Sequence, residues 1–361
     1  MKKLARKNIL KIKSYVPGKP IDEVKREMGL KRVIKLASNE NPFGPSPRVL
    51  RAIQQEAKEL NRYPDGECYK LKKQLAKRLG VGPQQLIFGN GSDEIIVMAI
   101  RAFVDSKDEV IIAKPSFLIY EIASKAAGAK VKAVSLKDFR YNLEAMSKAV
   151  NKRTKIIFIG NPDNPAGTYV TQNELVNFLG RLRRDVVVFI DEAYFEYVSS
   201  SDYPRSIELL KKFKNIIISR TFSKMYGLAG LRIGYGIANE EMVEILNRVR
   251  DPFNVNSLAQ AAALACLKDR AYYCEVARRL NEQKNFLYEE LSAMGVIFRR
   301  TATNFILINV GKDSRQVSQE LLRKGLIVRD MGAWGLKNFI RLTIGREEEN
   351  KTFIQALREI L

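Results

Sequence analysis

The sequence predicts an α/β protein, with a large domain that has a mostly parallel central sheet sandwiched by helices and a small α+β domain. In the middle of the chain, short β-branched runs alternate with segments of helical period, which is typical of a parallel sheet covered by helices. After about residue 256 this alternation gives way to helices mixed with short strands. A chain of 361 residues, 46% of them hydrophobic, is long enough to build both cores.

Four apolar runs are expected to form the buried strands of the large sheet, because β-branched residues dominate them and polar residues do not alternate. They span residues 109–113, 154–160, 185–191 and 215–219. Helices should begin near Ser92 and Ser116. A third should begin at Thr171, where Thr171 and Glu174 form a capping-box pattern.

The last third of the chain should form the small domain. A long helical stretch is expected from residue 257 to about 296, followed by a strand-like run, a helix, two short strands and a final helix from near Arg346. We expect the N-terminal segment to pack with this domain. The predicted division is therefore an N-terminal segment 1–45, a large domain 46–255 and a small domain 256–361, with a ligand in the groove between them.

Composition narrows the possible chemistry. Lys and Arg number 62 against 40 Asp and Glu, and this net charge of +22 favours anionic ligands. The chain contains no histidine, which excludes Ser-His-Asp and Cys-His catalysis and imidazole–zinc sites, and we expect no metal. Three irregularly spaced cysteines, Cys68, Cys266 and Cys274, favour a reducing compartment. No signal-peptide or membrane-span pattern is present, so we expect a cytoplasmic protein without a membrane partner.

The strongest motif is SRTFSKMYGLAGLRIGY, residues 219–235. Lys224 follows a strand of buried type and lies among small and hydroxyl residues, where an amine can lose its proton and form a Schiff base with an aldehyde cofactor. Thr221, Ser223 and Arg232 are nearby in sequence. Two hydroxyls and a guanidinium are suitable donors for a phosphate group.

A second candidate phosphate element is FGNGSDE, residues 88–94. A glycine turn that leads into a helix at Ser92 and Asp93 presents free backbone N–H groups and the positive end of the helix dipole to an anion. The alternative is that Ser92 merely caps the helix, and the sequence does not separate the two.

Polar residues also end two of the expected strands. Asp191 ends a buried strand, where a carboxylate requires a cationic partner such as a protonated heterocycle, or else caps a helix. Tyr194 follows three residues later and can donate to a ring oxygen. The proline-rich turn at 160–170 projects Asn161 and Asn164 near the same strand ends.

In this order, the motifs resemble those of the fold type I pyridoxal-phosphate aminotransferases, and among them those that act on histidinol phosphate. The resemblance extends from about Ser14 to the C-terminus. The matching motifs are SNENPFGPSP (38–47), RYPD (62–65), GNGSDE (89–94), NPDNPAGT (161–168), DEAYFEY (191–197), RTFSKMYGLAGLRIGY (220–235), PFNVN (252–256), IVRD (327–330) and IRLTIG (340–345). Two positions depart from the common pattern: Phe117 replaces a tyrosine and Ala166 replaces a threonine.

The resemblance implies a role for each matching residue. Lys224 would bind pyridoxal 5′-phosphate covalently and move the substrate proton, and Asp191 would pair with the pyridinium nitrogen. Asn164 and Tyr194 would bind the phenolic oxygen of the cofactor, while Phe117 would stack on its ring.

The cofactor phosphate has its own implied set of ligands. These are the backbone amides of Ser92 and Asp93 and the side chains of Thr221, Ser223 and Arg232, with Tyr63 reaching in from a second subunit. The resemblance therefore implies a homodimer with shared active sites.

For the substrate, the implied binding residues are Tyr15, Asn41, Arg329 and Arg341. The implied reaction moves an amino group between L-histidinol phosphate and 2-oxoglutarate, giving imidazole-acetol phosphate and L-glutamate by a ping-pong scheme in histidine biosynthesis. Because both substrates visit one site, one arginine pair would bind the phosphate of one and the carboxylate of the other.

Two alternatives share the same fold: an aromatic amino-acid aminotransferase and a threonine-phosphate decarboxylase. The lysine and the phosphate ligands do not discriminate among them, because these residues serve the cofactor. A nucleic-acid partner, which the net charge of +22 suggests, is not expected, since the basic residues are spread along the chain and no nucleic-acid motif is present.

Overall fold

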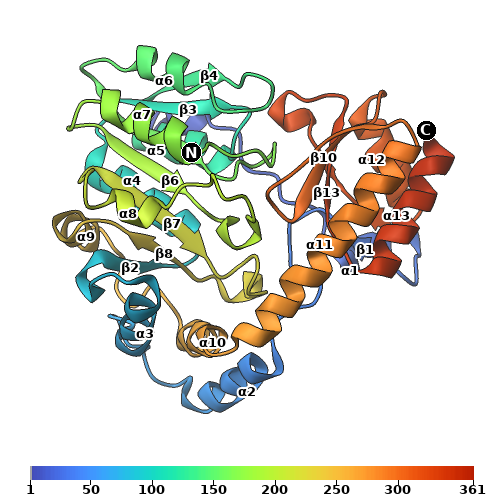
Figure 1. Ribbon diagram of the computed structural model, residues 1–361, viewed down its shortest axis with the longest axis horizontal. Helices are drawn as coiled ribbons and strands as arrows, with labels where there is room; N and C mark the ends of the chain where they lie inside the picture. Colours follow the sequence, from blue (N-terminus) through green and yellow to red (C-terminus); the bar gives the residue numbers. More distant parts are fainter. Residues whose placement is uncertain (1) are drawn as a thin grey trace.

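The computed structural model describes residues 2–361 and contains a seven-stranded sheet beside a smaller four-stranded one (Figure 1). The large sheet has the order β2-β8-β7-β6-β5-β3-β4. Its strands are β2 (Leu86–Gly89), β3 (Glu109–Lys114), β4 (Lys130–Ser135), β5 (Thr154–Gly160), β6 (Val187–Asp191), β7 (Ile216–Thr221) and β8 (Gly234–Ile237). Neighbours from β4 to β7 are parallel, and only β8 is antiparallel to the strands beside it. The predicted α/β class with a mostly parallel sheet is confirmed.

Helices cover both faces of the large sheet. One face carries α4 (Ser92–Phe103), α5 (Leu118–Ala127) and α9 (Glu240–Asn247), and the other carries α6 (Leu143–Ala149), α7 (Gln172–Arg181) and α8 (Ser206–Leu209). Successive residues of β5 divide between these layers, since Ile156 packs with the first and Ile157 with the second. Burial on both faces explains why the expected strands are continuous apolar runs. The capping box of Thr171 and Glu174 begins α7, as predicted.

Strands β2, β4 and β8 were not predicted, because each is short, polar or rich in glycine. In β8 the glycines are required by close packing. A Cβ atom at Gly234 would lie 2.5 Å from the backbone nitrogen of Ser92, and one at Gly236 would lie 2.9 Å from Cγ2 of Ile87. These contacts bring the start of α4 against β8, at the edge where the candidate site lies.

The small sheet is antiparallel and has the order β12-β13-β10-β9. Its strands are β9 (Ile297–Arg299), β10 (Phe305–Asn309), β12 (Arg329–Asp330) and β13 (Phe339–Thr343), and it packs with α12 (Ser314–Arg323) and α13 (Glu347–Ile360). The N-terminal segment joins this lobe, because β1 (Ile34–Lys35) pairs in parallel with β11 (Leu326–Ile327). That pairing supports the proposed grouping of the N-terminal segment with the small domain.

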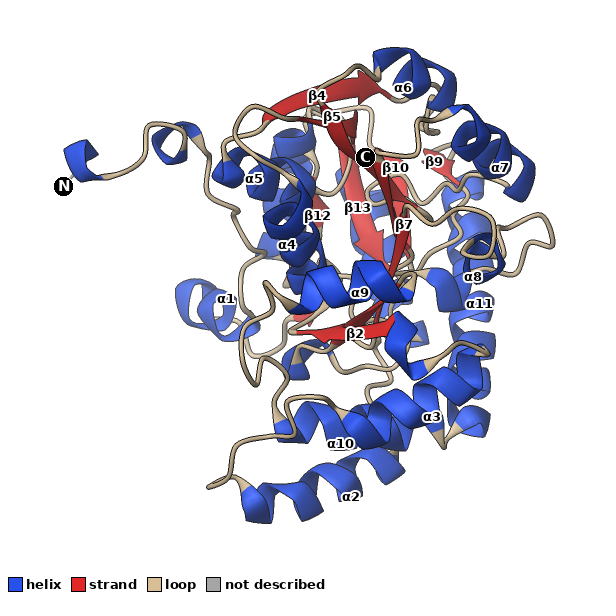
Figure 2. Cartoon of the chain, turned by 90° about the vertical axis from the view of Figure 1, so that its left-hand side faces the viewer, coloured by secondary structure: helices blue, strands red, loops and turns tan. Residues whose placement is uncertain are grey.

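The single long helical stretch expected at 257–296 is in fact two helices, α10 (Ser257–Leu267) and α11 (Arg270–Ala293). Both views place α10 beside α2 (Pro47–Glu56) and α3 (Tyr69–Leu79), whereas α11 runs toward the small sheet (Figures 1 and 2). The division at residues 45 and 255 remains a proposal. Helix α10 follows the predicted boundary at residue 255 but still packs against α2 and α3 of the predicted large domain, so the packing does not change at that boundary.

The N-terminal residues form an arm that extends from the body of the protein (Figure 2). Short helices at η1 (Lys2–Leu4) and η2 (Ile9–Lys11) interrupt it, and α1 (Ile21–Met28) follows. The side chains of Arg6 and Asn8 donate to the carbonyls of Ala126 and Lys125, both at 2.8 Å. Within residues 2–361, no helix is both long and apolar enough to cross a membrane.

Candidate active site

The predicted site residues gather in one pocket between the C-terminal ends of β6 and β7 and the small lobe. Those that line it are Tyr15, Ser92, Asp93, Phe117, Asn164, Asp191, Tyr194, Thr221, Ser223, Lys224, Arg232, Arg329 and Arg341. They come from both lobes and from the N-terminal segment. Two predicted residues, Asn41 and Tyr63, lie elsewhere and are described below.

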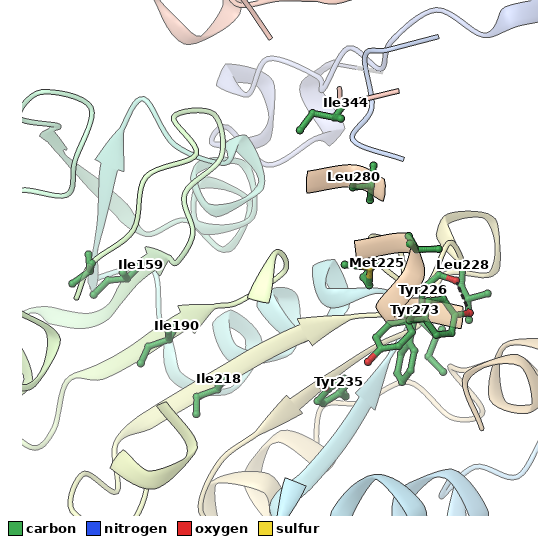
Figure 3. Close-up of a cluster of buried hydrophobic side chains, with 14 of the residues drawn as sticks. Ile159, Ile190, Ile218, Met225, Tyr226, Leu228, Tyr235, Tyr273, Leu280 and Ile344 are labelled. Atoms are coloured by element: carbon green, nitrogen blue, oxygen red, sulfur yellow. Dashed lines mark hydrogen bonds between the residues drawn. The ribbon is translucent and has the colours of Figure 1, made fainter. Parts of the chain in front are cut away.

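Lys224 occupies a loop that buried side chains hold in place. The residues after it, Met225, Tyr226 and Leu228, point into the core next to Tyr273 (Figure 3). The rings of Tyr226 and Tyr273 are 4.9 Å apart, and the hydroxyl of Tyr273 donates to the carbonyl of Tyr226 at 3.3 Å. Gly227 has φ +70°, and a Cβ atom there would lie 2.7 Å from the backbone of Gly44. Loop and lysine are thus fixed relative to the sheet.

The Lys224 amine is partly buried, and it donates to the carbonyl of Ser38 at 3.3 Å. Burial lowers the pKa of Lys224 to about 8, and the positive charge of Arg341 contributes to this shift as the second largest cause. Within residues 2–361 it forms no ion pair with a carboxylate, which would favour the charged form. About a tenth of the amine is therefore uncharged at pH 7, far more than for an unperturbed lysine, and the uncharged form is the one that acts as a nucleophile or proton acceptor.

This lowered pKa predicts how cofactor capture by the apo-protein depends on pH. Because only the neutral amine attacks an aldehyde, the second-order capture rate should rise about tenfold per pH unit below pH ~8 and level off above it. An unperturbed lysine would give a rate that rises past pH ~10. Stopped-flow absorbance with pyridoxal 5′-phosphate measures this profile, and a rise without a plateau up to pH 10 would contradict the assigned environment.

Asp191 lies at the end of β6 and is only 5% exposed. One carboxylate oxygen accepts from the Tyr120 hydroxyl at 2.7 Å, and the other accepts from the Ser219 hydroxyl at 3.0 Å. Burial raises its pKa to about 6, and no basic side chain within residues 2–361 pairs with it. No α-helix begins here, so the alternative role as a helix cap is wrong. A cationic ring nitrogen bound in the pocket would supply the missing partner.

Tyr194 and Asn164 meet in the same pocket. The Tyr194 hydroxyl accepts from Asn39 Nδ2 at 2.8 Å and from Asn164 Nδ2 at 3.3 Å, and burial raises the pKa of Tyr194 to about 12. The neutral hydroxyl keeps its own proton free to donate to a ligand oxygen. Asn161, in contrast, turns away and exchanges two hydrogen bonds with the backbone of Val170.

An anion site is formed where α4 begins beside Arg232. The cap of α4 is Gly91, with φ +79° and no side chain, so the alternative in which Ser92 caps the helix is wrong. Arg232 lies over Gly91 so closely that a Cβ atom there would be 2.6 Å from its Nη2 atom. Arg232 also donates to Ser223 Oγ at 3.4 Å and to Asp93 at 3.1 Å. Free helix amides, hydroxyls and a guanidinium thus meet around one point.

Two further guanidinium groups face the pocket from the small lobe. Arg341 is 6% exposed and donates to the carbonyl of Ala37 at 3.0 Å and to Asn164 Oδ1, while its Nε atom has no hydrogen-bond partner in the described part of the chain. Arg329 donates to the carbonyl of Val16 at 2.7 Å. Neither forms an ion pair with a carboxylate within residues 2–361. The buried guanidinium of Arg341 and the partly exposed one of Arg329 are both uncompensated, and such groups are suited to an anionic ligand.

Asn41 lies outside this pocket, although it was predicted to bind substrate. Its amide donates to the carbonyl of Met225 at 2.8 Å, and its oxygen accepts from the Phe43 backbone at 2.9 Å. Asn39, two residues earlier, lines the pocket instead. Its positive φ of 56° turns the side chain inward, which the motif letters do not reveal.

Tyr63 is 83% exposed and also lies outside the pocket of its own protomer. Its ring stacks on that of Phe253 with 4.9 Å between centroids. The residues that contact the predicted ones or line the pocket but were not predicted include Asn39, Tyr120, Ser219 and Trp334. Asn39 and Ser219 lie within quoted motifs without a distinguishing signal of their own, and Tyr120 and Trp334 lie in no motif.

Comparison with known proteins identifies the family. The profile of "Aminotransferase class I and II" matches residues 31–357. The chain belongs to the aminotransferase class I and II family. As a member it is 48% identical to the histidinol-phosphate aminotransferase of Moorella thermoacetica, over 99% of this chain and 92% of that protein. It is 47% identical to the enzyme of the same name from Caldicellulosiruptor saccharolyticus, over 99% of both chains.

A solved structure shows the same fold for this aminotransferase. The histidinol-phosphate aminotransferase of Sinorhizobium meliloti, in complex with pyridoxal-5′-phosphate, superposes with a TM-score of 0.91 at 29% identity and covers 98% of this chain and 97% of that one. The predicted fold type I class is therefore confirmed. An aminotransferase of this family is an enzyme, and the pocket around Lys224 is its candidate active site.

Proposed function

We propose that this aminotransferase moves an amino group between L-histidinol phosphate and 2-oxoglutarate, with pyridoxal 5′-phosphate as cofactor. The observation that carries the proposal is the placement of Arg341. Among the residues that the structure describes, this buried guanidinium has no carboxylate partner and its Nε atom has no hydrogen-bond partner, and it shares the pocket with a lysine of lowered pKa. The names of the relatives at 47–48% identity support the substrate.

The pocket residues fit the proposed cofactor on three observations. Asp191 is a buried carboxylate that pairs with no cation of residues 2–361, Arg232 and the start of α4 form an anion site, and Tyr194 has a donor free for a ring oxygen. Lys224 would hold the aldehyde carbon, Asn164 would assist Tyr194, and Phe117 would cover the ring. When bound, pyridoxal phosphate supplies an electron sink that stabilises negative charge on the substrate's Cα atom.

The chain's own contribution to the reaction is proton transfer and orientation. Lys224 Nζ accepts the proton that leaves the substrate's Cα, and its burial favours this because it lowers the pKa of the amine toward neutral pH. Asp191 stays ionised beside a ring cation, since an opposite charge lowers the pKa that burial has raised. Tyr120 and Ser219 hold both of its oxygens and fix the direction of the carboxylate.

For substrate binding, we propose that Arg341 and Arg329 receive the anionic end of each substrate in turn. A phosphate and a carboxylate both accept paired hydrogen bonds from a guanidinium, so one arginine pair can serve both half-reactions. Tyr15, whose ring lies 5.7 Å from the Arg329 guanidinium carbon, closes the same end of the pocket.

Replacing Arg341 with glutamine should weaken the binding of both substrates. The loss of one charge-assisted interaction predicts a KM about 10- to 100-fold higher for L-histidinol phosphate and for 2-oxoglutarate, with a smaller change in kcat. Steady-state kinetics with each substrate varied in turn measures this. An increase for only one substrate would show that the two anions do not share Arg341.

Two other activities use the same cofactor residues: transamination of aromatic amino acids, and decarboxylation of threonine phosphate. Lys224, Asp191 and Arg232 would serve all three reactions equally. The two guanidinium groups beyond the one in the cofactor's anion site disfavour an aromatic amino acid, whose side chain would leave a buried charge unmatched. They would bind threonine phosphate as well, and the names of the relatives favour histidinol phosphate over it.

We also propose a homodimer in which Tyr63 of each subunit reaches the cofactor phosphate of the other. The stacked rings of Tyr63 and Phe253 form an exposed apolar patch, with 83% and 49% of these residues exposed. Such a patch is typical of a surface covered by another subunit.

We further propose a cytoplasmic location. Cys68, Cys266 and Cys274 are all free thiols, as is usual in a reducing compartment.

A further inference from the structure

Trp334 is the only tryptophan in the chain, and no motif singled it out. It ends the short helix η7 (Gly332–Trp334), between β12 and β13 of the small sheet. The side chain is 6% exposed and lines the same pocket as Lys224 and Arg329. A large aromatic ring therefore borders the proposed substrate site from the small lobe.

The indole ring lies against the guanidinium group of Arg329. The Arg329 Cζ atom is 5.1 Å from the centroid of the Trp334 ring and 5.7 Å from that of Tyr15. One of its nitrogens donates to the carbonyl of Val16 at 2.7 Å. Two aromatic rings and one carbonyl hold the guanidinium in place without neutralising it, so its remaining N–H groups stay available to an anion.

The indole is itself fixed by the large lobe. Its Nε1–H donates to the carbonyl of Ser116 at 3.0 Å in a buried hydrogen bond. Ser116 immediately precedes Phe117, the residue proposed to cover the cofactor ring. Leu118 and Phe139, also of the large lobe, pack against the small apolar cluster to which Trp334 belongs. Trp334 thus connects the anion-binding arginine of one lobe to the cofactor-covering segment of the other.

We propose that Trp334 is a positioning residue that sets the location of Arg329 over the pocket and so determines the affinity of the site for the substrate's anionic end. The inference rests on the proposed function, because it assigns Arg329 to anion binding. An arginine side chain otherwise samples many rotamers, and a ring anchored at its N–H edge removes part of that freedom before the ligand arrives.

A double-mutant cycle on the holoenzyme tests this coupling. Trp334→Met fills much of the indole volume but has no aromatic face, and Arg329→Gln removes the charge. The probe is inorganic phosphate, whose binding is measured by equilibrium dialysis with radiolabelled phosphate and does not depend on turnover. Each single variant should weaken phosphate binding about tenfold, and the double variant should be no more than about threefold weaker than either. Additive losses in the double variant would overturn the proposal.

The conservative variant Trp334→Phe separates positioning from a purely structural role. It keeps a ring face for Arg329 and loses the N–H group, so phosphate binding should stay within about threefold of wild type. Adding Arg329→Gln to the Phe variant should weaken phosphate binding about tenfold, as it does in the wild type. This pair also serves as the test if the Met variant does not fold. A Phe variant that is insensitive to the loss of Arg329 would contradict the role of the ring.

Kinetics supply the second readout. With L-histidinol phosphate, Trp334→Met should raise KM about tenfold and leave kcat within about threefold, with an unchanged absorption band of the bound cofactor. A lower kcat with unchanged KM, or loss of the cofactor band, would assign Trp334 a structural role instead. If the wild type does not transaminate histidinol phosphate at all, the proposed function fails, while the phosphate-binding cycle still decides whether Trp334 positions Arg329.

Discussion

Replacing Lys224 with alanine should reduce turnover by at least about 10⁴-fold, because the pocket then loses both its nucleophile and its proton carrier. Within residues 2–361, no other lysine lines the pocket. The purified variant should also lack the absorption band of covalently held cofactor. Steady-state kinetics and an absorption spectrum of the same sample measure both effects.

Two controls define what this result means. Lys224→Arg keeps a positive charge but provides no neutral amine at neutral pH, so it should be as inactive as the alanine variant. The midpoint of thermal unfolding of the apo-protein should change little in either variant, since the amine makes a single hydrogen bond, to Ser38. Substantial activity in the alanine variant would show that another group carries the chemistry.

Replacing Asp191 with asparagine should lower kcat about 10²- to 10⁴-fold while the cofactor still binds covalently at Lys224. The amide keeps the size of the side chain but cannot hold a ring nitrogen in its protonated state. The stabilisation of negative charge at the substrate's Cα is then weakened. Single-turnover kinetics, which isolate the chemical step from product release, measure the loss.

Tyr120→Phe is the matched control for the variant Asp191→Asn. It removes the 2.7 Å hydrogen bond to the same carboxylate but leaves the charge in place. The loss of one hydrogen bond predicts only about a 3- to 10-fold decrease in the same rate. Equal losses in Asp191→Asn and Tyr120→Phe would indicate that geometry, and not the charge of Asp191, controls the step.

The sequence was sufficient to predict the centre of the large sheet and most of the pocket. Strands such as β5 and β6 are buried on both faces, so they appear as uninterrupted β-branched runs. Asp191 is the last residue of β6 and Lys224 comes shortly after the end of β7, and parallel strands bring their C-terminal ends to one edge. Strong local patterns and a simple topology together made these positions predictable.

What could not be predicted depends on contacts between distant segments. Strand β8 consists of four residues, two of them glycine, and its place in the sheet comes from packing against β2 and α4. Asn39 and Asn41 are equivalent in the motif, and only the positive φ of Asn39 decides which one faces the pocket. Trp334 has no local signal, because its partners Arg329 and Ser116 belong to separate segments that only the fold brings together.

The most direct test of the proposed substrate is a single-turnover spectrum of the holoenzyme mixed with L-histidinol phosphate, with phosphothreonine and phenylalanine in parallel. The proposal predicts that the bound cofactor changes from its aldehyde to its amine form at the lowest concentration with L-histidinol phosphate. Conversion at lower concentration with phenylalanine would make the chain an aromatic amino-acid aminotransferase. Release of carbon dioxide from phosphothreonine would make it a decarboxylase, and either result would contradict the proposed function.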